Sequence, residues 1–150
     1  MLSKLIHSQT PYTLIVTPEI NELQDVESRL EQYDSLSILS VGIELSIYLS
    51  AIPSKEWGRE TRNWMTTKCR EATPNLLVCS QIDLLFEPSL SLDPLSLFQS
   101  MSRINRLIVL WPGRIQDGRL SYAVPEHAHY RTWQQPDAPV FDWQAQRVYH

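Results

Sequence analysis

The sequence predicts a single α/β domain, residues 1–150, in which helices cover both faces of a mostly parallel sheet. Strand-like and helix-like segments alternate in the order β-α-β-α-α-β-α-β, which is typical of a parallel sheet with crossover helices. Two apolar runs, at 75–80 and 106–111, are bounded by turn-forming residues, as expected of strands that are buried on both faces. The 150 residues, 43% hydrophobic and 20% charged, suit one globular domain with its own core.

The first strand and the first helix are expected near the start of the chain. Tyr12 to Val16 follows Pro11 and is rich in β-branched and aromatic residues, which favours a strand. A helix is predicted from Pro18 to Tyr33, with Thr17 as its N-cap and Pro18 at its first position. Apolar residues at steps of three and four give this helix one buried stripe, formed by Ile20, Leu23, Val26 and Leu30.

The middle of the chain predicts one short strand and two helices. Ser37 to Val41 is short and apolar and follows a turn-prone pair, so we expect the second strand there. Glu44 to Ala51 is predicted to be helical and to end before a proline. The segment from Lys55 to Ala72 has a helical pattern of charges, with Trp57 and Trp64 seven residues apart on one face.

The third and fourth strands carry the strongest apolar signal. They are expected at Asn75 to Ser80 (NLLVCS) and at Arg106 to Trp111 (RLIVLW), the latter closed by Pro112-Gly113. Between them a helix is predicted from Pro94 to Ser102, because Asp93 is a good N-cap and proline suits the first helical position.

The chain changes character after about residue 114. Gln116-Asp117-Gly118-Arg119 predicts a turn before a short strand from Leu120 to Val124. The remaining residues are rich in Pro, Trp and Tyr without periodicity, which predicts a small antiparallel or irregular extension packed at the edge of the domain. Trp133 and Trp143 could each pack in the core or contact another subunit, and the sequence leaves both alternatives open.

Composition narrows the classes of function. The formal net charge of −4 offers no attractive field to nucleic acid, so DNA contact is expected to be weak or indirect. Cys69 and Cys79 lie in a predicted helix and a predicted strand without metal-ligand spacing, which favours two reduced thiols and no metal. The apolar run at the N-terminus is too short for a signal peptide or a membrane span, so a cytoplasmic protein without a membrane partner is expected.

The turn after the first strand is where a parallel α/β protein would bind a phosphate. When the pattern G-x-x-x-x-G-K-[ST] is laid over this turn, none of its four chemical positions is satisfied. Thr17 and Glu22 replace the two glycines, Leu23 replaces the lysine, and Gln24 replaces the hydroxyl residue. This pattern alone favours the simple interpretation that the chain is unrelated to phosphate-loop proteins.

The second half of the chain suggests a family. Asn75 to Trp133 resembles BrxF, the small P-loop subunit of BREX-type phage-resistance systems. The first half matches in outline only, through Leu14 to Pro18 and Glu44-Leu45. The residues that carry the resemblance are Leu84-Leu85-Phe86-Glu87-Pro88, Asp93-Pro94-Leu95, Ser102-Arg103, Trp111-Pro112-Gly113, Tyr122-Ala123, Pro125, His127 and Tyr130.

The resemblance implies a P-loop-NTPase-like three-layer sandwich and a role in antiviral defence. Family members have an intact Walker A turn, and their third strand ends in an aspartate suited to magnesium. Here Ser80 stands at that aspartate's position, while Asp83 matches a second acidic position. The resemblance thus implies a non-catalytic subunit without a cofactor, which contacts other subunits of a defence complex; contact with copies of itself is a further option.

Two other functions stay open at the sequence level. One is an ATP-binding or ATP-hydrolysing protein that uses Mg²⁺ and an unconventional site around Asp83, Arg103 and Arg114. The other is a DNA-contacting accessory module with a basic stripe formed by Arg103, Arg106, Arg114 and Arg119.

Several side chains are candidates for partner or anion contacts, although a structural role is an alternative for each. They are Arg103, Arg106, Trp111, Arg114, His127, Tyr130 and Trp133. Asp83 and Glu87 have a spacing that could hold a cation between them on a helix, but no third ligand accompanies them, so a solvated loop is the simpler interpretation.

Overall fold

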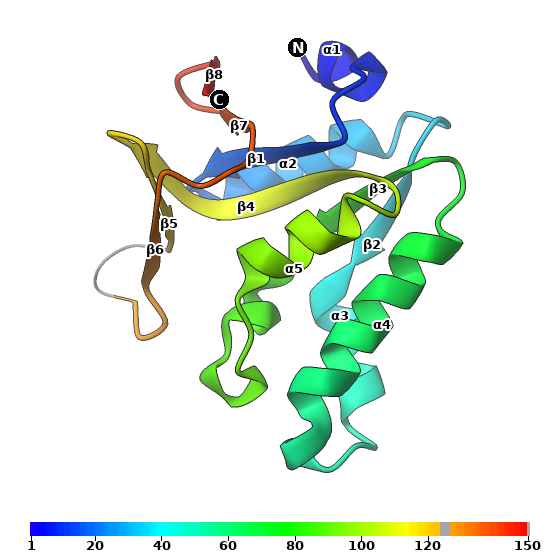
Figure 1. Cartoon of the computed structure of the whole chain (residues 1–150). Helices are drawn as coiled ribbons and strands as arrows, with labels where there is room; N and C mark the ends of the chain where they lie inside the picture. Colours follow the sequence, from blue (N-terminus) through cyan, green and yellow to red (C-terminus); the bar gives the residue numbers. More distant parts are fainter. Residues whose placement is uncertain (124–126, 150) are drawn as a thin grey trace.

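The computed structural model describes residues 1–123 and 127–149, which form an α/β fold around a mixed, mostly parallel sheet (Figure 1). The first half contains α1 (Leu2–His7), β1 (Tyr12–Thr17), α2 (Ile20–Leu30), β2 (Ser37–Ser40), α3 (Val41–Leu49), η1 (Ser54–Glu56) and α4 (Trp57–Glu71). The second half contains β3 (Leu76–Ser80), η2 (Ile82–Phe86), η3 (Pro88–Leu90), α5 (Pro94–Met101), β4 (Arg106–Gln116), β5 (Arg119–Tyr122), β6 (Arg131–Gln134), β7 (Val140–Asp142) and β8 (Arg147–Tyr149).

The main part of the sheet has the strand order β2-β3-β4-β1-β7-β8. The first five strands of this order run parallel, and β8 pairs antiparallel with β7. Strand β1 is central, because Leu14 is in register with Val109 of β4 on one side and with Val140 of β7 on the other. The carboxyl ends of the parallel strands therefore meet at one edge of the sheet, called the carboxyl edge below.

Alternating residues of the strands build two separate cores. Leu14, Val109 and Cys79 belong to one buried cluster, while Ile15, Ile108 and Val78 belong to the other. Side chains of successive strand residues point to opposite faces, so a strand that is apolar at every position must be covered on both sides. This confirms the prediction from the continuous apolar runs.

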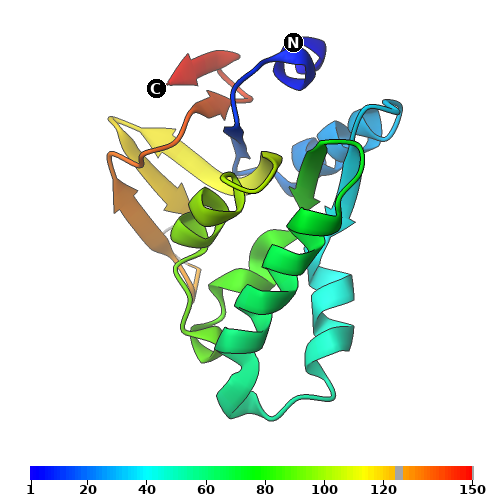
Figure 2. The same ribbon diagram turned by 45° about the vertical axis from the view of Figure 1, so that its right-hand side comes forward.

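The helices provide that cover. Helices α1 and α2 pack on one face through Leu2, Ile6, Val26 and Leu30. On the other face, α3, α4 and α5 supply Leu45, Met65 and Phe98 among other buried side chains. The turned view shows the helices α3, α4 and α5 together on their side of the sheet, and the arrangement is compatible with a three-layer sandwich (Figure 2).

The predicted helix boundaries need correction. Helix α2 begins at Ile20 and ends at Leu30, and Glu19 occupies its N-cap position, so the predicted N-cap at Thr17 and the predicted span to Tyr33 are wrong. Helix α1 was not expected, because six residues carry too short a periodic signal. Helix α3 follows β2 directly at Val41, without an intervening turn.

Strand β4 does not end at Trp111, contrary to the prediction. It continues through Pro112 to Gln116 and there pairs antiparallel with β5, which in turn pairs with β6. Gly113 makes this possible, since a Cβ atom at that position would lie 1.8 Å from the carbonyl oxygen of Ser121. The predicted turn is confirmed, because Asp117 and Gly118 both have positive φ, as a tight two-residue hairpin requires.

The expectation of an irregular tail is corrected in favour of the antiparallel alternative. A short strand was predicted from Leu120 to Val124, and the structure has β5 at Arg119–Tyr122. Val124 lies outside the described residues. Strands β6, β7 and β8 follow, and β7 adds a parallel strand beside β1. Within the described ranges, no helix has the length and apolar character that crossing a membrane requires.

Candidate functional site

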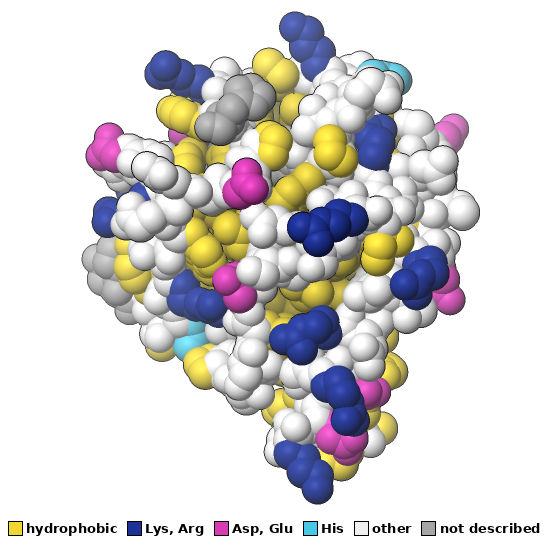
Figure 3. Space-filling model, in the orientation of Figure 1, with side chains coloured by type: hydrophobic (Ala, Val, Ile, Leu, Met, Phe, Trp, Pro, Cys, Tyr) yellow, Lys and Arg dark blue, Asp and Glu magenta, His cyan; other side chains and the backbone are white. Residues whose placement is uncertain are grey.

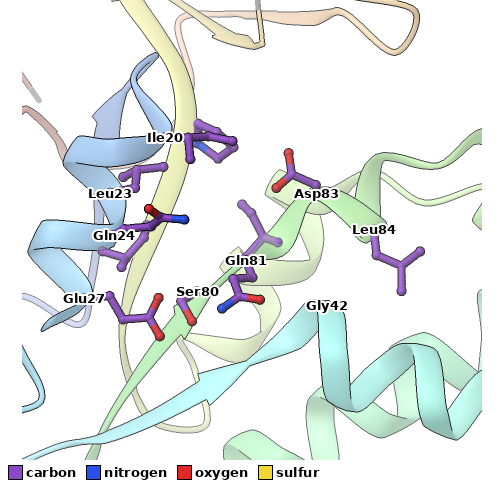
Figure 4. A pocket seen from close by; sticks show the side chains of 12 residues that line it. Ile20, Leu23, Gln24, Glu27, Gly42, Ser80, Gln81, Asp83 and Leu84 are labelled. Atoms are coloured by element: carbon purple, nitrogen blue, oxygen red, sulfur yellow. The ribbon is translucent and has the colours of Figure 1, made fainter.

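A cleft of about 310 Å³ opens at the carboxyl edge of the sheet, between α2, the start of α3, and the segment that follows β3 (Figure 4). Open α/β folds bind their ligands at this edge. The cleft is lined by Ile20, Leu23, Gln24, Glu27, Gly42, Ser80, Gln81, Ile82, Asp83, Leu84, Leu110 and Pro112. Parts of the chain that are far apart in sequence therefore meet here, and the cleft is the best candidate for a binding site.

The wall opposite α2 depends on a close backbone contact. The Gly42 N–H donates a hydrogen bond of 2.9 Å to the Gln81 carbonyl oxygen. A Cβ atom at Gly42 would lie 3.1 Å from that same oxygen, so a larger residue would push the two segments apart. Gln81 itself has φ 53° and ψ 53°, a left-handed conformation that few residues other than glycine adopt and that often marks functional sites.

The phosphate-loop position is occupied by a short hydrogen-bonded turn. Only two residues separate β1, which ends at Thr17, from α2, which begins at Ile20. The buried Thr17 hydroxyl donates to the Glu22 carboxylate at 2.8 Å, and the Gln144 side-chain amide donates to the same carboxylate oxygen at 2.8 Å. So short a turn has no loop to wrap a phosphate, and its acidic side chains would repel one.

The remaining Walker A positions line the cleft without the required chemistry. Leu23 and Gln24 project from α2 into the cleft, and among the described residues its lining contains Glu27 and Asp83 but no lysine or arginine. Phosphate sites depend on cationic side chains or on converging backbone N–H groups. The charge of this cleft therefore opposes an anionic ligand and favours a cationic one.

The Walker B position is similarly altered. Ser80 is buried at the end of β3, and its hydroxyl donates a weak hydrogen bond of 3.5 Å to the Leu39 carbonyl oxygen of β2. Asp83 lies in η2, where its carboxylate accepts a hydrogen bond of 2.6 Å from the Tyr122 hydroxyl. Burial raises the pKa of Tyr122, and the hydrogen bond to Asp83 raises it further, so this hydroxyl stays protonated as the donor.

Four aromatic residues pack together between η2, β4 and the C-terminal strands β5 and β6. Phe86 stacks on Tyr122 with ring centroids 3.7 Å apart, and Trp111 and Trp133 meet edge to face at 5.3 Å. The Trp111 indole donates to the Ser121 carbonyl oxygen, and that of Trp133 donates to Asp93. These contacts fasten β5 and β6 to the main domain, with Trp111 fully buried and Trp133 half-buried.

Trp143, the other tail tryptophan, also packs within the chain. Its half-buried ring lies against the core on the α1–α2 face, 6.0 Å from the ring of Phe141, and the Arg29 guanidinium lies over it.

The arginines predicted for an unconventional ATP site do not converge. Arg103 is exposed between α5 and β4, at the opposite edge of the sheet from Asp83, roughly 20 Å away along the strand. Arg106 is at the same far edge and donates to the carbonyl oxygens of Leu5 and Ile6, at 3.4 and 2.9 Å. It therefore satisfies the last turn of α1.

Arg114 lies elsewhere again. It is exposed on β4 beyond Gly113 and lines a separate polar groove of about 190 Å³ together with Asp142. Arg103, Arg106, Arg114 and Arg119 thus divide between two ends of the molecule and form no single basic stripe. On the face drawn in Figure 3, lysines and arginines are spread out with acidic residues among them, and apolar side chains gather near the centre.

His127 and Tyr130 lie in the turn before β6, which local hydrogen bonds close. The His127 ring nitrogen Nδ1 accepts a hydrogen bond of 3.0 Å from the His129 N–H, and the Tyr130 N–H donates to the His127 carbonyl oxygen. The Glu87 carboxylate lies 3.8 Å from the His129 ring nitrogen Nε2. Residues 1–123 and 127–149 contain no group of three side chains that could hold a metal ion.

Sequence reasoning missed Glu27, Gly42 and Gln81 among the residues that line the cleft. Glu27 could have been found, because it lies one helical turn after Leu23 and thus on the same side of α2. The signal for Gly42 and Gln81 is weak, since their closeness depends on how α3 packs against η2. A comparison with family models, curated proteins and solved structures gives no significant match to this chain.

Proposed function

We propose that this chain is a non-catalytic, P-loop-like subunit of a BREX-type antiphage defence complex and that it acts by protein contact. The resemblance of Asn75 to Trp133 to the BrxF family is one support. The position of the cleft is another, because it lies between the first turns of α2 and the end of β3, at the edge of the sheet where open α/β proteins bind their ligands.

One observation carries the non-catalytic part of the proposal. The two residues between Thr17 and Ile20 leave no phosphate loop, and the Thr17 hydroxyl is paired with the Glu22 carboxylate. The adjoining cleft has carboxylates where a nucleotide would need positive charge. A protein that hydrolyses ATP by a Walker mechanism needs both the loop and the charge.

Exposed apolar residues support protein contact as the replacement role. Ile20, on the cleft wall, is 57% exposed, and Ile43 and Ile47 on α3 are 59% and 69% exposed. One helical turn separates Ile43 from Ile47, so they share a face of α3 next to the one that carries Gly42. Apolar side chains gathered on a surface are typical of an interaction site.

Co-purification tests this proposal. The tagged chain is expressed with its neighbouring genes, and its complex is compared with those of Ile20→Asp, Ile43→Asp and the control Ile104→Asp. Ile104 is 41% exposed and lies at the far edge of the sheet. It is therefore an exposed isoleucine like the other two, but it lies away from the cleft.

We expect a stoichiometric partner encoded by a neighbouring gene. It should be retained by the wild type and by the control variant and lost from the other two variants, each shown by circular dichroism to be folded. The proposal fails if the chain purifies alone from cells that it protects against phage. It also fails if all three variants keep the partner equally.

A further inference from the structure

We propose that the cleft receives a basic side chain, arginine or lysine, from an apolar segment of the partner protein. This inference rests on the proposed function, since it names the chemistry of the partner at that same site. It starts from the charges of the cleft: within the part of the chain that the structure describes, the lining holds the carboxylates of Glu27 and Asp83 and no cationic side chain.

The Glu27 carboxylate is available for such a contact. The residue is half-buried on α2, and within the described part of the chain it forms neither an ion pair nor a side-chain hydrogen bond. Figure 4 shows its side chain extending from α2 toward Ser80, below Gln24. A carboxylate that is half removed from water and unpaired gains more from a cation than a fully exposed one does.

Asp83 forms the second acceptor on the other side of the cleft. Its Oδ1 atom accepts the hydrogen bond from Tyr122, which orients the carboxylate and leaves its other oxygen for a ligand. Figure 4 shows Asp83 on the η2 side, across the cleft from the α2 side chains. Glu27 and Asp83 thus face the cleft from different walls.

The floor between these acceptors suits the stem of a long basic side chain. Leu23, Ile82 and Leu110 supply apolar lining, while Gln24 and Gln81 add amide groups. Arginine and lysine bury their methylene stems against apolar surface and extend their charged heads to polar groups. A cleft of about 310 Å³ lies at the small end of ligand pockets, which span roughly 300–1,000 Å³, and so favours one side chain over a whole nucleotide.

The surroundings of the cleft favour a polypeptide as the source of this side chain. A free small cation would leave Ile20, Ile43 and Ile47 exposed, whereas apolar residues on either side of a basic one would cover part of them. The net charge of −4 also attracts a basic partner surface. The cleft therefore fits a segment in which apolar residues flank an arginine or a lysine.

Chemical-shift titration with short peptides tests the inference. The probes are acetyl-Leu-Arg-Leu-amide and its counterpart acetyl-Leu-Glu-Leu-amide, added to the wild type, to Glu27→Gln and to Glu31→Gln. Glu31 is a matched control, because it is an exposed glutamate one turn after Glu27 that does not line the cleft.

We expect the arginine peptide to shift the backbone amides of Gln24, Gly42 and Gln81 saturably, and the glutamate peptide to leave them unchanged. Glu27→Gln should lower the affinity for the arginine peptide about tenfold, which is the effect expected from loss of a charge-assisted hydrogen bond. Glu31→Gln should bind the peptide like the wild type. The inference is overturned if both peptides act alike, if the two variants bind equally, or if about 10 mM arginine peptide, which would occupy even a millimolar site, shifts none of these amides.

A parallel titration with Mg-ATP separates this inference from the proposed function. If Mg-ATP shifts the same amides saturably, the cleft binds nucleotide, and the part of the proposed function that rests on lost nucleotide chemistry is wrong. If neither Mg-ATP nor the arginine peptide shifts them, the basic-side-chain inference fails while the co-purification result still decides the proposed function.

Discussion

The hydroxyl of Tyr122 donates a hydrogen bond of 2.6 Å to the carboxylate of Asp83, across 39 positions of sequence. This bond connects β5, in the C-terminal part of the chain, to η2 at the wall of the cleft. Phe86, on the same η2 segment, stacks on the Tyr122 ring. The C-terminal strands therefore hold one wall of the cleft in place, and the tail is part of the site's support.

Removing the Tyr122 hydroxyl should destabilise the fold. Tyr122→Phe is expected to lower the free energy of unfolding by about 1.5 kcal/mol, as for loss of a hydrogen bond to a charged acceptor. Tyr48→Phe is the matched control, because the Tyr48 hydroxyl bonds to Glu60 at the exposed surface. Urea unfolding at neutral pH measures both variants, and equal unfolding midpoints for the two would contradict this role of Tyr122.

The stability of the protein should fall at alkaline pH. Burial raises the pKa values of Tyr12 and Cys79 above their ordinary values of about 10 and 8.5, so the native state holds these protons when the unfolded state has released them. The stabilising contribution is complete below about pH 8 and is lost progressively as the pH rises past 8.5 and then 10. Unfolding midpoints in urea at neutral and alkaline pH measure this loss.

Tyr12→Phe sharpens the test of that alkaline effect. The buried Tyr12 hydroxyl has no hydrogen-bond partner among the described residues, so its removal should cost little or even stabilise at neutral pH. The variant should also lose less stability than the wild type above pH 10. A wild-type protein equally stable from pH 7 to pH 11 would refute the account, as would a variant with an unchanged alkaline loss.

Gly113 should tolerate no side chain. Gly113→Ala places a Cβ atom against the Ser121 carbonyl oxygen in the middle of the β4–β5 pairing, and we expect a loss of about 3 kcal/mol. Gly118→Ala meets no atom within 4 Å and is strained only by its positive φ, so about 1 kcal/mol is expected. Thermal unfolding of the two variants ranks them, and the reverse order would show that β4 does not continue through Gly113.

Arg106 should matter for α1 rather than for any ligand. The Arg106 guanidinium donates hydrogen bonds to the carbonyl oxygens of Leu5 and Ile6, and Arg106→Met removes both bonds. Helix α1 should therefore fray, and the free energy of unfolding should fall by about 1–2 kcal/mol. Arg103→Met, at an exposed position, should change stability by less than about 0.5 kcal/mol. Amide hydrogen exchange of residues 5–7 reports the fraying, and unchanged protection there in Arg106→Met would be the contrary result.

The parallel part of the fold is visible in the sequence because its signal is local. An uninterrupted apolar run such as Leu76 to Ser80 has to be covered on both faces, whatever its neighbours are. Strand β7 carries no comparable signal, because its three residues become a strand through pairing with β1 and β8. Similarly, Pro112-Gly113 indicates a stop by local propensity, but pairing with β5 carries β4 through it.

The location of the site could be predicted from the sequence, but most of the residues that form it could not. The turn after β1 could be located and found to lack the phosphate-loop residues, since both depend on residues that are consecutive in the sequence. The opposing wall of the cleft could not be predicted from the sequence. The left-handed backbone of Gln81 and its contact with Gly42 arise from the packing of α3 against η2. Asp83 was found by resemblance, whereas its bond to Tyr122 is a long-range contact without a local pattern.

Titration calorimetry of Mg-ATP into the purified chain tests the central claim most directly. The two-residue turn after β1 and the acidic cleft predict no saturable heat at micromolar nucleotide concentrations. One-site binding with a dissociation constant in the micromolar range or below would contradict the claim that this site has lost its nucleotide chemistry.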